Sequence, residues 1–177
     1  RWTGASTPGA PSEPLPGDPQ WAGGSLHTDV REVHTQASPE DLWAAVECIG
    51  GHNGWYSSSI LWEARGLIDR AVGGVGLRRG RRDPNRLMIG EAVDFWRVEE
   101  MEADRLLRLR AEMKVPGRAW LQFEIREEGG ECVVHQTAIF DPLGLFGLLY
   151  WYGIYPVHVL IFKGMLNRIA RAVREGC

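Results

Sequence analysis

Cysteine is scarce in this sequence, and its placement excludes two kinds of cross-linked protein. The 177 residues contain three cysteines, Cys48, Cys132 and Cys177. An odd and widely spaced set forms neither a disulfide framework nor a C-x-x-C metal knuckle. The five histidines are also dispersed, with no pair at the i,i+4 spacing of a zinc helix. We therefore expect free thiols in a reducing cytoplasm, and neither a metal nor a cofactor in this chain.

The sequence also lacks an excess of positive charge. Its formal net charge is -3, whereas a dedicated nucleic-acid binder carries a strongly basic domain. The most basic run, GGVGLRRGRR at 73–82, misses the glycine spacing of a dinucleotide-binding loop and the ending of a phosphate loop. Two interpretations of this run stay open: a helix end and turn with solvated arginines, or a rim that binds an anionic group.

A long uninterrupted apolar run is absent as well. The stretch between Asp141 and Lys163 carries no Asp, Glu, Lys or Arg, which is nearly the length of a membrane span. It is interrupted by three glycines, a proline and a histidine, at Gly144, Gly147, Gly153, Pro156 and His158. We expect a loop followed by a buried helix, with no membrane span. The start shows no signal peptide, and Arg1 in place of Met suggests a piece of a longer protein.

The composition changes near residue 24. Residues 1–24 contain five prolines among glycine and serine, which favours an extended tether over a packed element. The remaining chain has the length and the apolar content of one core. We therefore predict a tether at 1–24 and a single domain over 25–177.

Local patterns predict a mixed α and β domain. A strand at 26–36 is followed by a helix that begins at the N-cap Ser38 and ends at Gly50-Gly51. Further elements are expected as a helix over 60–72, strands near 92–100, 105–114, 118–127 and 131–140, and a long helix over 157–173. Together they predict an α+β fold in which a curved antiparallel sheet wraps around the C-terminal helix, an arrangement that can enclose a cavity.

Strand alternation divides the side chains of the predicted meander between two faces. One face is predicted to be mainly polar, with Asp94, Trp96, Arg108, Arg110, Glu112, Trp120, Gln122 and Gln136. The other is predicted to meet the core, with Phe95, Leu107, Leu109, Ala111, Met113, Leu121, Phe123 and Ile139. A turn near Ala103 would place Asp94 opposite Glu112 and Trp96 opposite Arg110. The polar face could be a solvated surface with ion pairs, the wall of a pocket, or a docking surface anchored by tryptophans.

Six segments carry a resemblance to a known bacterial family: GGHNGWY, LWEARGLIDRAVGGVGLRRGRRDP, GEAVDFWRVE, LRLRAEMKVPGRAWLQFEI, HQTAIFDPLGLFGLLYWY and PVHVLIFKGM. In this order they resemble the family called domain of unknown function 2867, over about residues 18–172. The resemblance implies a helix-grip domain, START-like and SRPBCC-like, that often follows an NmrA-like NAD(P)-binding domain. A partner of that kind is expected in cis or in trans. No Rossmann half is visible in this chain, which speaks against redox activity of the chain alone.

Three functions remain as hypotheses. The first is binding of a small, largely apolar molecule in a helix-grip cavity, as an accessory domain to an NAD(P)-binding, oxidoreductase-like partner. The second is a biosynthetic enzyme of the cyclase or dehydratase type that uses a pocket carboxylate, and the third is a protein-interaction module. The ligand-binding candidates are Trp55, Arg79, Arg81, Trp96, Arg110, Trp120, Gln136 and Tyr152. The catalytic candidates are Glu112, Asp94 and His158, with Glu112 and His158 as an acid-base pair.

Overall fold

The computed structural model describes residues 26–51, 81–83 and 85–175 of the chain. The predicted tether at 1–24, the predicted helix over 60–72, and the candidates Trp55 and Arg79 lie outside the described residues.

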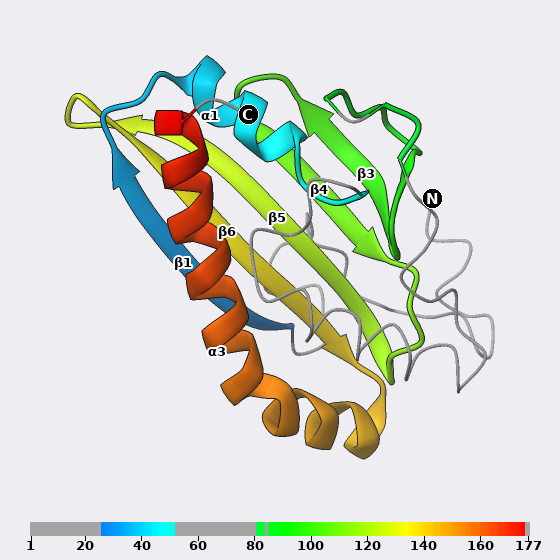
Figure 1. Cartoon of the computed structure of the whole chain (residues 1–177). Helices are drawn as coiled ribbons and strands as arrows, with labels where there is room; N and C mark the ends of the chain where they lie inside the picture. The colour runs from blue at the N-terminus through cyan, green and yellow to red at the C-terminus, as the bar shows by residue number, and fades with distance from the viewer. Residues whose placement is uncertain (1–25, 52–80, 84, 176–177) are drawn as a thin grey trace, which may run out of the picture.

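A six-stranded antiparallel sheet forms the body of the described chain, and two helices lie on one of its faces (Figure 1). The elements follow the chain as β1 (His27–Thr35), α1 (Pro39–Glu47), β2 (Ala92–Val93), β3 (Trp96–Glu102), β4 (Leu106–Ala111), β5 (Gly117–Glu128), β6 (Glu131–Pro142) and α3 (Gly144–Glu175). The strand order is β1-β6-β5-β4-β3-β2, so every neighbour except the pair of β1 and β6 is a sequential hairpin. The curved sheet with a long C-terminal helix confirms the predicted fold class.

The core lies between the sheet and the two helices, on the side that we call the helix face. The helix α1 begins as predicted, since the Ser38 side chain accepts a hydrogen bond from the Asp41 backbone N–H and Pro39 starts the first turn. The core is built from apolar side chains of α1, the central strands and α3: Leu42, Val46, Leu107, Leu109, Leu121, Phe123, Phe162, Met165 and Ile169. Burial of this set is the main source of the stability that holds α3 on the sheet.

The strand expected near 92–100 is two strands, which corrects the prediction. A two-residue turn at Asp94 and Phe95 separates β2 from β3, with Val93 paired to Trp96. Asp94 adopts a φ of 55°, a left-handed conformation that a short polar side chain tolerates better than most. Because the turn contains no glycine, the sequence has no glycine signal that would predict it.

The register between β3 and β4 also differs from the prediction by one residue. Trp96 lies opposite Ala111, and Arg97 lies opposite Arg110. The strands turn at Asp104, which has a φ of 60°, and a bulge between Val98 and Glu100 shifts the pairing by one. Alternation alone does not reveal such an extra residue.

The helix α3 begins at Gly144, so the segment expected to be a loop before residue 157 is helical. The helix continues through Pro156, although proline cannot donate the hydrogen bond that a helix interior uses. Tertiary packing explains this outcome better than helix propensity. The Trp151 ring is buried and stacks on Phe140 of β6 with 5.6 Å between the ring centroids, which fixes this part of the helix against the sheet.

The first turn of α3 approaches the backbone of the sheet so closely that only glycine fits at position 147. A Cβ atom there would lie 2.6 Å from the Pro116 carbonyl oxygen and 2.7 Å from the Pro142 Cα. Gly153, six residues later, has no atom near the place of its Cβ.

We therefore expect opposite effects from the same substitution at these two glycines. Gly147→Ala should lower the free energy of unfolding by about 1–3 kcal/mol, because backbone atoms must move to admit the methyl group. Gly153→Ala should raise it by about 0.5–1 kcal/mol through the lower helix propensity of glycine. Urea unfolding followed by circular dichroism measures both. A stabilised Gly147→Ala variant would show that the helix start is not held against the sheet.

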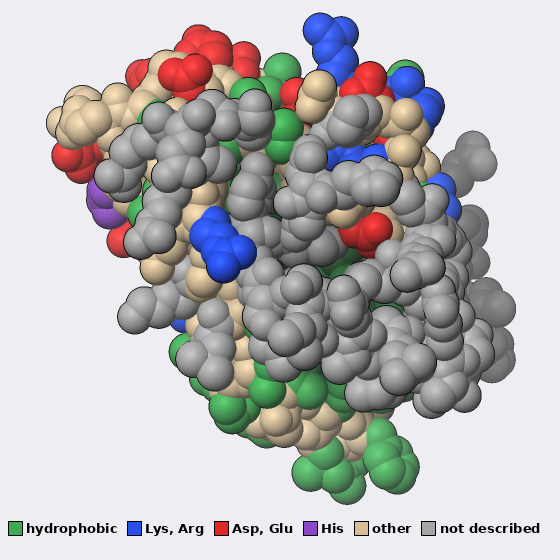
Figure 2. Space-filling model, viewed as in Figure 1, with side chains coloured by type: hydrophobic (Ala, Val, Ile, Leu, Met, Phe, Trp, Pro, Cys, Tyr) green, Lys and Arg blue, Asp and Glu red, His purple; other side chains and the backbone are tan. Residues whose placement is uncertain are grey.

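Apolar side chains are exposed at the start of α3. Figure 2 shows them as a green group at the lower end of the molecule, and they include Leu143, Leu145, Phe146 and Leu149. Among the described residues, no single helix is long and apolar enough to span a membrane. The two parts of α3, Gly144–Val159 and Gly164–Ala170, are long and apolar enough for a span only when they are taken together, and they are bent by 40° relative to each other.

Candidate functional site

The structure divides the predicted polar face between the two sides of the sheet. Gln136 is paired with Phe123 and therefore lies on the helix face, in the core, and Trp96 lies on that face beside Ala111. Ile139, predicted for the core face, is paired with Trp120 on the opposite face. The cause is the two-residue turn at Gly129 and Gly130, which pairs Glu128 with Glu131 and so sets the register of the whole β5–β6 hairpin.

Both tryptophans that could anchor a partner are interior residues. Trp96 is 5% exposed and Trp120 is 2% exposed, and they lie on different faces of the sheet. A side chain without exposed surface cannot insert into a partner unless the domain opens. The hypothesis of a docking surface anchored by these two tryptophans is therefore wrong.

Ion pairs cover the exposed part of the opposite face, as one of the open interpretations predicted. The Arg97 Nε donates to the Glu112 carboxylate at 2.5 Å, and this contact raises the pKa of Arg97. Arg108 donates to Gln122 at 3.0 Å and to the Glu100 carboxylate. Arg110 is exposed between these groups. Glu112 lies on this face, whereas His158 belongs to α3 on the helix face, so the predicted acid-base pair is not brought together.

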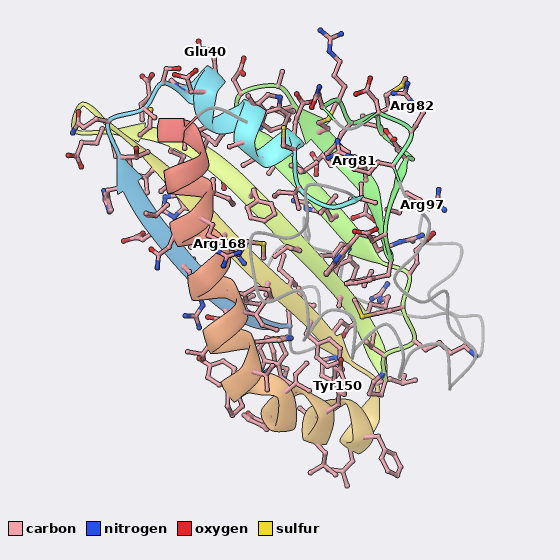
Figure 3. All side chains as sticks on the ribbon, in the orientation of Figure 1. Glu40, Arg81, Arg82, Arg97, Tyr150 and Arg168 are labelled. Carbon is pink, nitrogen blue, oxygen red and sulfur yellow. The ribbon has the colours of Figure 1, made fainter. Side chains whose placement is uncertain are left out.

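Asp94 and Arg81 each bond instead to the backbone of the segment that follows α1. The Asp94 carboxylate accepts a hydrogen bond from the Gly51 N–H at 3.0 Å. The Arg81 Nη1 donates to the Ile49 carbonyl at 2.8 Å, and burial lowers the pKa of the Arg81 guanidinium. Figure 3 shows Arg81 close to the loop that follows α1. Both side chains thus hold the backbone where α1 ends. The next residue, Arg82, donates its backbone N–H to the Glu91 carboxylate at 3.1 Å.

A different group of polar side chains lies on the helix face, between the sheet edge and α3. We call it the interior polar cluster, and it consists of His27, Asp29 and Arg31 on β1, Gln136 on β6 and His158 on α3. The register of β1 and β6 places the three β1 residues opposite Phe140, Ala138 and Gln136. Sequence reasoning identified Gln136 and His158 as candidates but missed the β1 residues, whose alternation along the strand was the available signal.

Gln136 is the most unusual member of the interior polar cluster. Its side chain is 1% exposed. Neither its amide nitrogen nor its amide oxygen has a hydrogen-bond partner in the structure. A buried amide without partners costs folding free energy, so such a group in a folded protein calls for an explanation. The Nδ1 of His158 and the Nε2 of His27 are buried without a partner as well.

The charges in the interior polar cluster compensate each other. The Arg31 Nη2 lies 2.9 Å from the Asp29 carboxylate, and Asp29 is only 8% exposed. Burial lowers the pKa of His158 to about 4, while the Asp29 charge raises it and the Arg31 charge lowers it. His158 is therefore neutral at physiological pH, with one ring nitrogen able to accept a hydrogen bond and the other able to donate one.

Aromatic rings surround His158 and His27. The His158 ring lies 4.9 Å from Phe162 and 5.7 Å from Trp151, measured between ring centroids. His27 lies 5.8 Å from the same Trp151 ring. The predicted ligand residue Tyr152 contacts His27 edge-on at 6.0 Å but is 65% exposed. The arrangement combines apolar rings with a few polar groups, which is the usual composition of a small-molecule site.

Solved structures of other proteins share this fold. Norcoclaurine synthase from Thalictrum flavum aligns with a TM-score of 0.53 and 10% identity, over 85% of this chain and 88% of that chain. Ara h 8.0201 aligns with a TM-score of 0.50 and 10% identity, over 86% of this chain and 100% of that chain. The fold is thus a helix-grip fold of the Bet v1-like, SRPBCC type.

Within this class, the chain belongs to the family described as protein of unknown function DUF2867, whose model matches residues 21–165. The predicted family is therefore confirmed. No curated protein matches the sequence.

Proposed function

We propose that the chain binds a small, largely apolar molecule between the sheet and α3, next to the interior polar cluster. The observation that carries the proposal is Gln136, an amide that is 1% exposed with both polar atoms unpartnered. A bound molecule would supply the hydrogen bonds that the protein itself does not. The aromatic rings beside His158 offer the apolar surface that such a molecule needs.

The family resemblance extends this proposal to an accessory role. In that role the domain serves an NAD(P)-binding, oxidoreductase-like partner, in cis or in trans, by holding a small molecule for it. The enzyme alternative finds less support, because Glu112 is paired with Arg97 and Asp94 is bonded to the backbone near α1. Neither carboxylate belongs to the interior polar cluster.

Native mass spectrometry of the purified protein tests the proposal most directly. We expect a fraction of the molecules to carry a small mass increment above 19.8 kDa that is lost on denaturation. The proposal would be contradicted if the protein never carried such an increment and bound no naphthalene derivative.

The cost of the buried amide can also be measured. Gln136→Leu should raise the free energy of unfolding of the ligand-free protein by about 1–3 kcal/mol, because leucine has no polar group to leave unpaired. Chemical unfolding measures this difference. Gln122→Leu is the matched control on the opposite face, and it should lower the free energy by about 1 kcal/mol, because the Gln122 oxygen accepts a bond from Arg108. A destabilised Gln136→Leu variant would show that the amide is already satisfied.

A further inference from the structure

The open polar atoms of Gln136 define what kind of group would satisfy them. A primary amide presents an N–H donor and a C=O acceptor side by side. Both are buried and unpartnered in Gln136. A group with a donor and an acceptor in the complementary arrangement can form both hydrogen bonds at once, whereas an ether, a ketone or a hydrocarbon leaves at least one atom unpaired.

The position of His158 brings a second polar group to the same level of the sheet. The α3 helix runs back along β6 (Figure 1), and Trp151 of α3 stacks on Phe140 of β6. Seven residues further, His158 lies about 10.5 Å along the helix axis, which corresponds to about three residues of a strand at 3.3 Å each. His158 is therefore near the level of residues 136–138, in agreement with the influence of the Asp29 and Arg31 charges on its pKa.

The charges of the cluster decide the charge of the ligand. The Arg31 guanidinium donates to the Asp29 carboxylate through both Nε, at 3.2 Å, and Nη2, at 2.9 Å. His158 is neutral. A charged ligand group placed beside Gln136 would lose its hydration without gaining an uncompensated countercharge from the interior polar cluster, which is a large penalty. An uncharged group avoids it.

We propose that the bound molecule carries an uncharged group with a hydrogen-bond donor beside an acceptor, such as a carboxamide, lactam or imide, and that the Gln136 amide holds this group. The inference rests on the proposed function and specifies the ligand class for the same site. The aromatic rings of Trp151 and Phe162 contact the apolar body of the molecule. The Asp29–Arg31 pair disfavours charged ligand groups, because its two charges already compensate each other.

Four probes of nearly equal shape test this specificity by isothermal titration calorimetry: 2-isopropylnaphthalene, 2-acetylnaphthalene, 2-naphthamide and 2-naphthoate. They present no polar group, an acceptor alone, a donor and an acceptor, and an anion. We expect 2-naphthamide to bind about tenfold more tightly than 2-isopropylnaphthalene, as two hydrogen bonds to an otherwise unpaired amide would give. We expect 2-naphthoate to bind most weakly.

Variants at two glutamines locate the effect. Gln136→Leu should weaken 2-naphthamide about tenfold and leave 2-isopropylnaphthalene unchanged. Gln136→Met, which keeps the length of the side chain but removes both the donor and the acceptor, should also lose the preference. Gln122→Leu, on the opposite face of the sheet, should bind all four probes as the unchanged protein does.

The outcomes separate this inference from the proposed function. If 2-naphthoate binds most tightly, or if all four probes bind alike, the inferred ligand class is wrong while binding of an apolar molecule stands. If the preference for 2-naphthamide survives in Gln136→Leu, the amide is not the recognising group and the inference fails. If none of the probes binds, both the proposed function and the inference are contradicted.

Discussion

Trp120→Ala is expected to lower the free energy of unfolding by about 3–5 kcal/mol, the range typical of deleting a buried large aromatic side chain. Trp120 is 2% exposed. It lies beside Ile139 and Arg110 on the face of the sheet opposite α3, and the Arg118 guanidinium lies 5.4 Å from the centre of its ring. Alanine would forfeit the ring contacts, its hydrophobic burial and this cation–π contact. Guanidinium unfolding followed by circular dichroism measures the loss.

Phe146→Ala is the matched control, because Phe146 is 80% exposed. We expect it to change the free energy of unfolding by less than about 0.5 kcal/mol. If Trp120→Ala were as mild as this control, Trp120 would be a surface residue, and the docking-anchor hypothesis would return.

Acidification should destabilise the domain through His158. The pKa of this residue is lowered from 6.5 to about 4, mainly by burial. The unfolded chain therefore takes up the proton near pH 6.5, whereas the folded chain does so only near pH 4. The free energy of unfolding is unaffected by His158 above about pH 6.5, falls as the pH decreases from 6.5 to 4, and loses about 3 kcal/mol in total.

The pH range from 6.5 to 5 isolates this effect, because most carboxylates remain ionised there. His158→Phe should flatten the pH dependence of the free energy of unfolding in that range. His34→Gln is the control, since the His34 side chain is 53% exposed, and this variant should retain the slope. An unchanged slope in His158→Phe would mean that the histidine is solvated and not part of a buried site.

Local signals in the sequence were sufficient for the elements that depend on neighbouring residues. Ser38 and Pro39 mark the start of α1 because capping involves residues within one turn. The Gly129-Gly130 pair marks the β5–β6 turn because both residues need positive φ angles, of 61° and 86°. The same turn fixes the pairing of Gln136 with Phe123. The side of the sheet on which Gln136 lies could therefore have been predicted from the sequence.

Other parts of the fold had no local signal. The turn at Asp94 lacks glycine, and the bulge near Val98 adds one residue that alternation cannot detect. In the first turn of α3, Gly147 closely approaches the backbone at Pro116 and Pro142. Those contacts oppose the low helix propensity of glycine and become visible only when the segments are together in space.

The candidate site was partly predictable for the same reason. Gln136 and His158 stood out as polar groups within apolar segments, but their neighbours Asp29 and Arg31 come from the first strand. The pairing of β1 with β6 joins residues that are 97 to 113 positions apart, and no periodic pattern in one strand reveals its partner. The position of the Asp29–Arg31 ion pair beside Gln136 therefore had to come from the structure.

The pairing of β1 with β6 also bears on how the protein acquires its site. Among the described elements, the strand β1 is synthesised first, whereas β6 and α3 are synthesised last. Closing so long a stretch of chain is entropically unfavourable and slow compared with forming the sequential hairpins. The interior polar cluster is complete only when α3 has left the ribosome and packed on the sheet, because His158 belongs to α3.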